Sequence, residues 1–313
     1  LGRLERGVTP QRVVLEEEEA LDRLYLEYLL STLGTRLDGA RIVADCGNGA
    51  SYRLAPEMLR RAGAHVTAIC VDPDGRNINL GCGALHLERA REAVLAEGAD
   101  FGVAFDGDAD RAIFVSASGK IVDGDGVLLA CSRALREAGH LAGGTVVSTV
   151  MANLGLEKAL EADGVRMVRT PVGDKYVLEE MVRLGAVLGG EQSGHVIFRE
   201  FATTGDGMLT ALRVFEIARR AGQGLDELTA DLKVYPQRLV NVRVREKRDL
   251  AELPAVAAEI RQVEESFAGT GRVLVRFSGT EPLARVMVEG SDPERVETSS
   301  ERIAAAIRRA IGS

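Results

Sequence analysis

The sequence contains few cysteines, and their spacing matches no known motif. Cys46, Cys70, Cys82 and Cys131 are far apart among the 313 residues, and no two of them form a Cys-x-x-Cys pair. This pattern suggests neither a zinc knuckle nor a disulfide framework. It fits a protein of the reducing cytoplasm.

An excess of basic residues and a long hydrophobic run are also absent. Lysine and arginine together number 39, against 47 aspartates and glutamates, so the net charge is −8. A chain with this balance is not expected to bind nucleic acid or an anionic membrane. The longest uncharged apolar stretch, residues 141–156, is interrupted by glycines and polar residues and is too short to cross a bilayer. Chemistry on a small molecule is therefore the expected kind of function.

Length and segment order predict the domain organisation. A chain of 313 residues exceeds one typical domain, so two or three domains are expected. After a helix at residues 15–33, strands are expected at residues 41–45, 65–71, 101–105, 145–149, 166–170 and 186–188. Helices are expected between and after them, at residues 52–62, 85–97, 126–138, 154–162, 175–184 and 207–221. This alternation predicts mostly parallel sheets with helices on both faces.

The pattern changes after residue 233. Strands are expected at residues 238–245, 272–277 and 285–289, and helices at residues 250–263 and 293–310. The predicted fold class is therefore α/β, with two similar mixed or parallel α/β sandwich domains followed by a small α+β C-terminal domain. The expected domain boundaries are residues 1–117, 118–233 and 234–313.

Three carboxylates follow the predicted strand at residues 101–105. Asp106, Asp108 and Asp110 occupy alternate positions, and crowding like charges in this way is costly without a cation. An EF-hand is excluded because Arg111 stands where that motif needs glycine. Three hard oxygens with open positions suit Mg²⁺ acting on a phosphate. A solvated acidic turn is the alternative interpretation.

Two further loops are rich in polar groups. Residues 189–195 offer the carboxylate of Glu191, the hydroxyl of Ser193 and the imidazole of His195, a set that suits the hydroxyls of a sugar. A lone loop histidine is more often structural than catalytic. Residues 276–282, with Arg285, offer hydroxyls, a glycine N–H and two guanidiniums, which suit a phosphate; a hairpin turn with surface arginines is the alternative. Together the three loops indicate a phosphorylated sugar in a cleft, with phosphoryl transfer as the leading reaction.

The sequence resembles the α-D-phosphohexomutase superfamily, and within it the bacterial phosphoglucosamine mutases. Residues 106–111 resemble the magnesium loop, residues 190–195 the sugar loop and residues 276–282 the phosphate loop. The match runs over essentially the whole chain in family order. Residues 77–86, a polar and glycine-rich loop with no evident chemistry of its own, resemble the segment that marks the glucosamine branch rather than the phosphomannomutase and phosphoglucomutase branch.

The resemblance implies an isomerase that converts glucosamine 6-phosphate to glucosamine 1-phosphate through glucosamine 1,6-bisphosphate, in amino-sugar and peptidoglycan-precursor synthesis. It implies Mg²⁺ on Asp106, Asp108 and Asp110. The substrate-binding residues that it implies are Glu191, Ser193, His195, Arg276, Ser278, Gly279, Thr280 and Arg285. Arg111, Lys175 and His195 are the candidate catalytic residues that it implies; Lys175 stands where the branch more often has arginine.

The family's first domain carries a phosphoserine next to His-Asn-Pro. No Ser-His-Asn-Pro stretch occurs in the 313 residues, and residues 1–12 contain neither an initiator methionine nor a signal-peptide pattern. We therefore expect the chain to start inside a larger protein and to correspond to the second, third and fourth family domains. Its expected partners are the phosphorylated amino sugar and the missing N-terminal domain, with a homodimer as a further candidate. Alone it is expected to be inactive.

Two other classes of protein stay open at this point. A haloacid-dehalogenase-like phosphatase also places Asp-x-Asp after a buried strand, and Asp106 would then be a covalent nucleophile. The third carboxylate and the phosphate loop argue against it. A non-catalytic sugar-phosphate-binding remnant is the other alternative.

Overall fold

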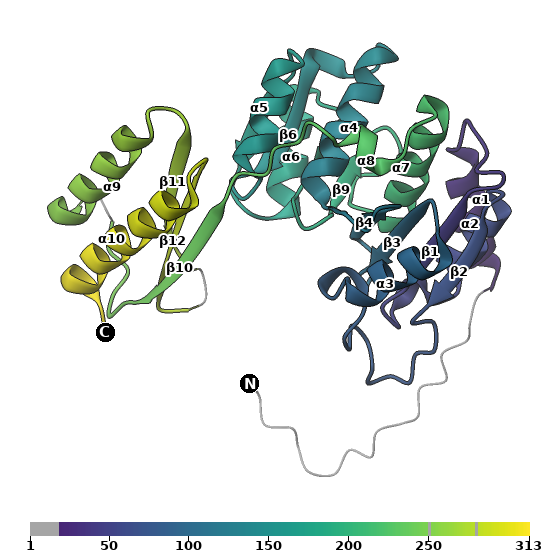
Figure 1. Ribbon diagram of the computed structural model, residues 1–313, viewed down its shortest axis with the longest axis horizontal. Coiled ribbons are helices and arrows are strands. Elements are labelled where there is room, and N and C mark those ends of the chain that lie inside the picture. The colour runs from purple at the N-terminus through teal and green to yellow at the C-terminus, as the bar shows by residue number, and fades with distance from the viewer. Residues whose placement is uncertain (1–18, 250–251, 279–280) are drawn as a thin grey trace, which may run out of the picture.

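Two α/β regions and a C-terminal α+β region follow one another along the chain (Figure 1). The computed structural model describes residues 19–249, 252–278 and 281–313. Within these ranges, no helix combines the length and the apolar character that a membrane span requires. The fold class expected from the sequence is confirmed.

The first region is a five-stranded mixed sheet in the order β2-β1-β3-β4-β5. Strands β1 (Arg41–Asp45), β2 (His65–Ile69) and β3 (Phe101–Phe105) are parallel, whereas β4 (Ala112–Ser116) and β5 (Ile121–Val122) are antiparallel to their neighbours. Helices α1 (Glu19–Ser31) and α2 (Leu54–Arg61) pack on one face, and α3 (Glu88–Glu97) packs on the other. The two antiparallel strands were not predicted, because the expected alternation of strands and helices leaves no place for a strand that directly follows another.

The second region repeats this topology with four strands in the order β7-β6-β8-β9. Strands β6 (Thr145–Thr149), β7 (Arg166–Thr170) and β8 (Leu188–Gly190) are parallel, and β9 (Val196–Phe198) is antiparallel to β8. The helices of this region are α4 (Gly124–Glu137), α5 (Leu154–Ala162), α6 (Asp174–Leu184), α7 (Gly207–Ala221) and α8 (Leu225–Leu228). The predicted similarity of the two regions is therefore confirmed.

Helix α7 joins the two α/β regions into one core. It contacts β9 of its own region and also β3 and β4 of the first. The ring of Phe215 lies 5.0 Å from that of Phe101 and 5.6 Å from that of Phe114, measured between centroids. Buried residues of both regions accordingly form a single hydrophobic cluster. This packing fixes the loops of the first sheet relative to those of the second.

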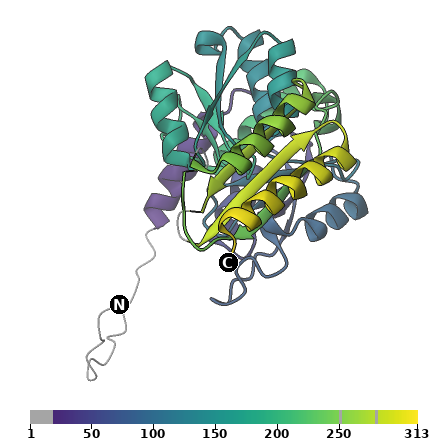
Figure 2. The same cartoon turned by 90° about the vertical axis from the view of Figure 1, so that its left-hand side faces the viewer.

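The C-terminal region has a hydrophobic core of its own. Strands β10 (Gln237–Arg243), β12 (Leu283–Gly290) and β11 (Gly271–Phe277) form an antiparallel sheet in that order. Helices α9 (Pro254–Phe267) and α10 (Pro293–Ile311) cover it, and they bury Val256 and Ile307 against Val286. In Figure 2 this region lies in front of the two α/β regions.

Side chains of the C-terminal sheet tie it to the start of α5. The buried Glu289 accepts a hydrogen bond from the backbone N–H of Leu154 at 2.9 Å. Arg272 pairs with Glu289 at 2.6 Å and donates to the carbonyls of Val150 and Ala152 at 2.8 and 2.7 Å. These contacts satisfy backbone groups at the N-terminal end of α5.

Some predicted ends are wrong by a few residues. The predicted helix at 52–62 is the shorter α2, which follows the 3₁₀ turn η1 (Ala50–Tyr52). The predicted helix at 85–97 begins only at Glu88, because η2 (Gly83–Leu85) precedes it; a third turn, η3 (Ala142–Gly144), precedes β6. Helix α9 begins at Pro254, a residue preorganised for the first helical position. Residue 250, the predicted start of this helix, and residues 15–18 of the first predicted helix lie outside the described residues.

Candidate functional site

The three aspartates lie in the turn between β3 and β4. β3 ends at Phe105 and β4 begins at Ala112, so residues 106–111 form a tight loop in which Ala109 adopts a left-handed φ of 64°. One carboxylate oxygen from each of Asp106, Asp108 and Asp110 lies within 4.8 Å of the other two. The predicted convergence of these side chains is thus present.

The electrostatics of this loop fit a cation. Asp106 is only 6% exposed, and burial, followed by the charges of Asp110 and Asp108, raises the pKa of its carboxyl to about 6. The Oδ1 atom of Asp110 is buried without a hydrogen-bond donor. The Nε atom of Arg111 lies 3.5 and 3.6 Å from the carboxylates of Asp106 and Asp110, too far for strong hydrogen bonds. A hard divalent ion would satisfy these oxygens.

The sugar-type loop occupies the equivalent turn of the second sheet, between β8 and β9. The backbone N–H of Glu191 donates to the carbonyl of His195 at 2.9 Å, which closes the loop. The carbonyl of Gly194 accepts a hydrogen bond from the N–H of Ala112 at 3.2 Å. Because Ala112 begins β4, this bond joins the two turns directly.

His195 contacts the aspartate loop through a hydrogen bond to Asp110. Its imidazole is buried, and its Nδ1 lies 3.1 Å from Oδ2 of Asp110. The N–H of Gly205 donates to Nε2 at 3.0 Å, so Nε2 is an acceptor and Nδ1 carries the proton that binds Asp110. Both ring nitrogens are therefore occupied. This geometry favours a structural role for His195 over one as acid or base.

Glu191 and Ser193 line a neighbouring cavity of about 350 Å³ together with Thr149, Met151, Val172 and Gln192. The Oε1 atom of Glu191 accepts a hydrogen bond from the N–H of Gly173 at 3.1 Å, which orients its carboxylate. Ser193 is exposed. Lys175 is also exposed, on the first turn of α6, and its amine lies 4.9 Å from the centre of the Tyr176 ring.

The arginines of the phosphate-type loop lie side by side on the C-terminal sheet. Arg276 of β11 and Arg285 of β12 are register partners. Burial, together with the charge of Arg285, lowers the pKa of Arg276. Arg285 pairs with Glu281 at 3.1 Å, yet its Nε is buried without a partner. Two crowded guanidiniums of this kind suit an anion.

The remaining residues of that loop are only partly described. Ser278 is buried. Gly279 and Thr280, the other two residues of this loop predicted to bind phosphate, lie outside the described residues. Among the residues that the structure describes, no hydrogen bond or ion pair joins this loop to the aspartate loop.

Residues 77–86 pack against the backbone of the aspartate loop, which the sequence did not reveal. Asn79 donates its N–H to the carbonyl of Gly47 at 2.8 Å. A Cβ atom at Gly107 would lie 2.7 Å from the side chain of Ile78 and 2.9 Å from that of Asn79. This contact explains why Gly107 separates the first two aspartates.

Comparison with known families agrees with this fold and site. Family models described as phosphoglucomutase/phosphomannomutase match in three parts: alpha/beta/alpha domain II at residues 23–119, alpha/beta/alpha domain III at residues 123–235 and the C-terminal domain at residues 239–306. The chain belongs to the phosphoglucomutase/phosphomannomutase family.

Individual relatives identify the branch. A phosphoglucosamine mutase from Solibacter usitatus is 72% identical over 308 residues, which cover 98% of this chain and 69% of the relative. One from Symbiobacterium thermophilum is 51% identical over 295 residues, covering 94% of this chain and 66% of that protein. The expected similarity to the phosphoglucosamine mutases is therefore confirmed. The chain spans about two thirds of the length of these relatives.

Solved structures support the fold. A phosphoglucomutase/phosphomannomutase family protein from Burkholderia thailandensis matches with a TM-score of 0.74 at 22% identity, covering 93% of this chain and 64% of that one. The N-acetylphosphoglucosamine mutase of Aspergillus fumigatus, solved with GlcNAc-6P and magnesium, matches with a TM-score of 0.73 at 23% identity, covering 93% and 66%.

Proposed function

We propose that this chain carries the magnesium-binding, sugar-binding and phosphate-binding parts of a phosphoglucosamine mutase, which interconverts glucosamine 6-phosphate and glucosamine 1-phosphate in the cytoplasm. The observation that carries the proposal is the junction of the aspartate turn and the sugar-type turn through His195 and Asp110 at 3.1 Å. The names of the relatives supply the substrate. The three parts correspond to residues 1–117, 118–233 and 234–313.

Asp106, Asp108 and Asp110 would hold Mg²⁺, as the lone buried oxygen of Asp110 and the raised pKa of Asp106 suggest. The ion, when bound, would neutralise charge on the phosphoryl group in transfer. Arg111, whose guanidinium lies beside two of these carboxylates, would contact the same phosphoryl group. Lys175 is the second cation that we assign to phosphoryl contact.

Glu191 and Ser193 would bind sugar hydroxyls in the cavity that they line. The mutase reaction presents first one end of the sugar and then the other, so contacts to hydroxyls are the kind that can serve both orientations. Arg276 and Arg285, with Ser278, Gly279 and Thr280, would bind the phosphate that is not being transferred. His195 would orient Asp110, and through its loop the sugar site.

The phosphoryl carrier is the part that these residues do not contain. In the proposed reaction a phosphoserine of the family's first domain gives its phosphoryl group to the substrate, which forms glucosamine 1,6-bisphosphate. The bisphosphate turns over and returns its other phosphoryl group to the serine. No sequence of that serine motif occurs among the 313 residues, so the first domain must be supplied.

The phosphatase alternative is disfavoured by the surroundings of Asp106. A nucleophilic carboxylate needs an accessible oxygen, but Asp106 is 6% exposed and its Oδ1 accepts the N–H of Arg111 at 3.1 Å. Incubation with a phosphosugar should therefore leave no aspartyl phosphate at Asp106. Detection of one by mass spectrometry would favour the phosphatase.

The direct test is an activity assay by complementation. Glucosamine 6-phosphate, catalytic glucosamine 1,6-bisphosphate and Mg²⁺ are supplied to the chain alone, to the first domain of a relative alone, and to both together. We expect turnover only in the mixture, rising with protein concentration because contacts between domains resemble transient interfaces. The Asp108→Asn variant is the matched control and should stay inactive in the mixture. Turnover by the chain alone would contradict the proposal.

A further inference from the structure

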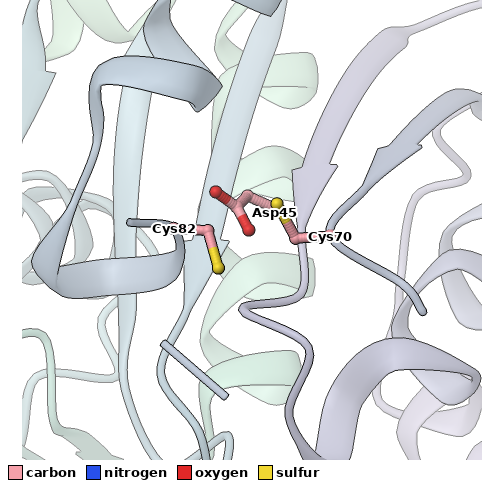
Figure 3. A group of neighbouring side chains, drawn as sticks. All are labelled: Asp45, Cys70 and Cys82. Atoms are coloured by element: carbon pink, nitrogen blue, oxygen red, sulfur yellow. The ribbon is translucent and has the colours of Figure 1, made fainter. Parts of the chain in front are cut away.

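A second group of metal-binding side chains lies at the carboxyl edge of the first sheet, apart from the aspartate turn. It consists of Asp45, Cys70 and Cys82, whose ligand atoms all lie within 4.8 Å of one another. Figure 3 shows the carboxylate of Asp45 between the two thiols in that view. The cysteines are 12 residues apart in sequence, so no spacing motif announces them.

The topology explains why these residues meet. Asp45 is the last residue of β1 and pairs with Ile69, the last residue of the parallel β2. Cys70 follows immediately and therefore lies beside Asp45. Cys82 comes from the loop before η2, and that loop is held there because Gly83 donates its N–H to Asp45 Oδ2 at 3.0 Å.

Asp45 is an unusual carboxylate. It is fully buried, and among the described residues its hydrogen-bond donors are two backbone N–H groups, those of Gly47 at 2.9 Å and Gly83 at 3.0 Å. Across the part of the chain that the structure describes, no lysine or arginine forms an ion pair with it. Buried carboxylates are normally paired with a cation or coordinate a metal.

The two thiols make the site selective. Thiolates are soft ligands that prefer zinc and related ions, whereas Mg²⁺ prefers the all-oxygen set of the aspartate turn. The guanidinium of Arg89 donates to Sγ of Cys70 at 3.8 Å and would offset part of the negative charge of a carboxylate and two thiolates. We infer that Asp45, Cys70 and Cys82 bind a thiophilic divalent cation of the zinc class, with a fourth position left open.

Oxidation of the two cysteines to a disulfide is the competing chemistry. A divalent cation displaces the two thiol protons to solvent when it binds. The geometry with a carboxylate among the sulfurs also serves coordination and has no use in a disulfide.

A cation bound at Asp45 would also affect the aspartate turn, because both sites adjoin strand β3. Asp45 pairs with Ala104 of β3, the strand that leads into that turn. The two glycines whose N–H groups bind Asp45 also pack closely against the end of β3. A Cβ atom added at Gly47 or Gly83 would lie 3.1 or 2.6 Å from the carbonyl oxygen of Phe105. A cation at Asp45 would therefore stiffen the support of the magnesium residues.

The test uses Cd²⁺ as a spectroscopic probe on the full chain, with excess Mg²⁺ present to occupy the aspartate turn. We expect an ultraviolet thiolate-to-cadmium band that saturates at one ion per chain, is reversed by a chelator and is displaced by Zn²⁺. Cys70→Ser and Cys82→Ser should each weaken binding by at least about tenfold, because even indirect partners of a metal are worth about 10–100-fold. Asp45→Asn should weaken binding while keeping the band. The buried Cys131 is elsewhere, so Cys131→Ala should change neither.

The inference would be overturned if the unmodified chain gave no band, if Cys70→Ser left the band intact, or if the intact mass of freshly prepared protein showed a disulfide between Cys70 and Cys82. X-ray absorption of the zinc-loaded, unmodified chain keeps the test independent of variant folding. Two sulfur neighbours are expected around zinc, and a shell of oxygen and nitrogen alone would refute the site.

Discussion

The imidazole of His195 and the carboxylate of Asp110 join turns that belong to different sheets, with Nδ1 3.1 Å from Oδ2. Both turns connect the third and fourth strands of their sheets, β3 to β4 and β8 to β9. Under the proposed function, a residue of the sugar-binding turn would thus orient a carboxylate of the magnesium-binding turn. With the backbone bond from Ala112 to Gly194, this hydrogen bond ties the two turns together.

Removal of the imidazole should therefore weaken magnesium binding. We expect His195→Ala to lower the affinity of the aspartate turn for Mg²⁺ by about 10–100-fold, the usual effect of losing a partner that orients a ligand. His195→Gln can still donate to Asp110 and should restore part of the affinity. Calorimetric titration measures both. The exposed His65 offers a control, and equal loss in His65→Ala would show that the effect is not local.

A methyl group at Gly205 should disturb the same support. A Cβ there would lie 2.4 Å from Nε2 of His195, closer than any real contact. We expect Gly205→Ala to destabilise the protein by about 1–3 kcal/mol, as overpacking of a buried site does. Thermal unfolding is the measurement, with Thr204→Ala on the exposed neighbour as control. An unchanged melting temperature would show that the ring can shift freely.

Arg276 should act on phosphate and not on stability. Charge-assisted hydrogen bonds contribute about 1.5–3 kcal/mol, which corresponds to about tenfold or more in affinity. Arg276→Ala should lose this much affinity for glucosamine 6-phosphate in a calorimetric titration while its melting temperature stays nearly the same. Arg261→Ala, on the exposed side of α9, should change neither quantity. Retained binding with a large loss of stability would make Arg276 a structural residue.

The buried carboxyl of Asp125 should make stability fall with rising pH. Burial, with the charge of Asp123, raises its pKa to about 8, whereas in an unfolded chain an aspartate titrates at about 3.9. The folded state thus keeps a proton that the unfolded state loses. Its contribution to stability is complete below about pH 4 and is lost as the pH rises to about 8.

Urea unfolding at about pH 5 and about pH 8 measures this effect. Asp125→Asn cannot lose a proton but can still accept the N–H of Asn153, so its stability should decline less between the two values. Glu264→Gln, which alters an exposed carboxyl on α9, should decline like the unmodified chain. Parallel declines in all three proteins would show that Asp125 is ionised in the folded state.

The sequence allowed some of this site to be predicted and hid the rest. Asp106, Asp108 and Asp110 are recognisable because their spacing alone places them in one turn. Asp45 and Cys70 meet only because β1 and β2 pair in parallel, a relationship that spans 25 residues and leaves no local pattern. The spacing of the cysteines in the sequence therefore gives no sign of the proposed site at Asp45, Cys70 and Cys82, which the fold brings together.

The antiparallel strands were missed for a similar reason. β4 and β9 each follow another strand with no helix between them, so the expected alternation of strands and helices leaves no place for either. The packing of α7 on the first sheet could not be predicted either. The apolar residues of α7 indicate a buried helix but do not indicate which sheet it packs against. In each case the missing information is a pairing between segments that are distant in sequence.

The contacts of Phe215 with Phe101 and Phe114 limit where recombination could divide the gene of such a protein. A break near residue 118 would separate the two α/β regions in sequence, yet it would remove α7, one of the helices that pack on the first sheet, and would uncover the contact of Phe215 with Phe101 and Phe114. Genetic exchange at that boundary would therefore divide two regions that share one hydrophobic core. The C-terminal region, with a core of its own, is the one segment that recombination could trade between relatives.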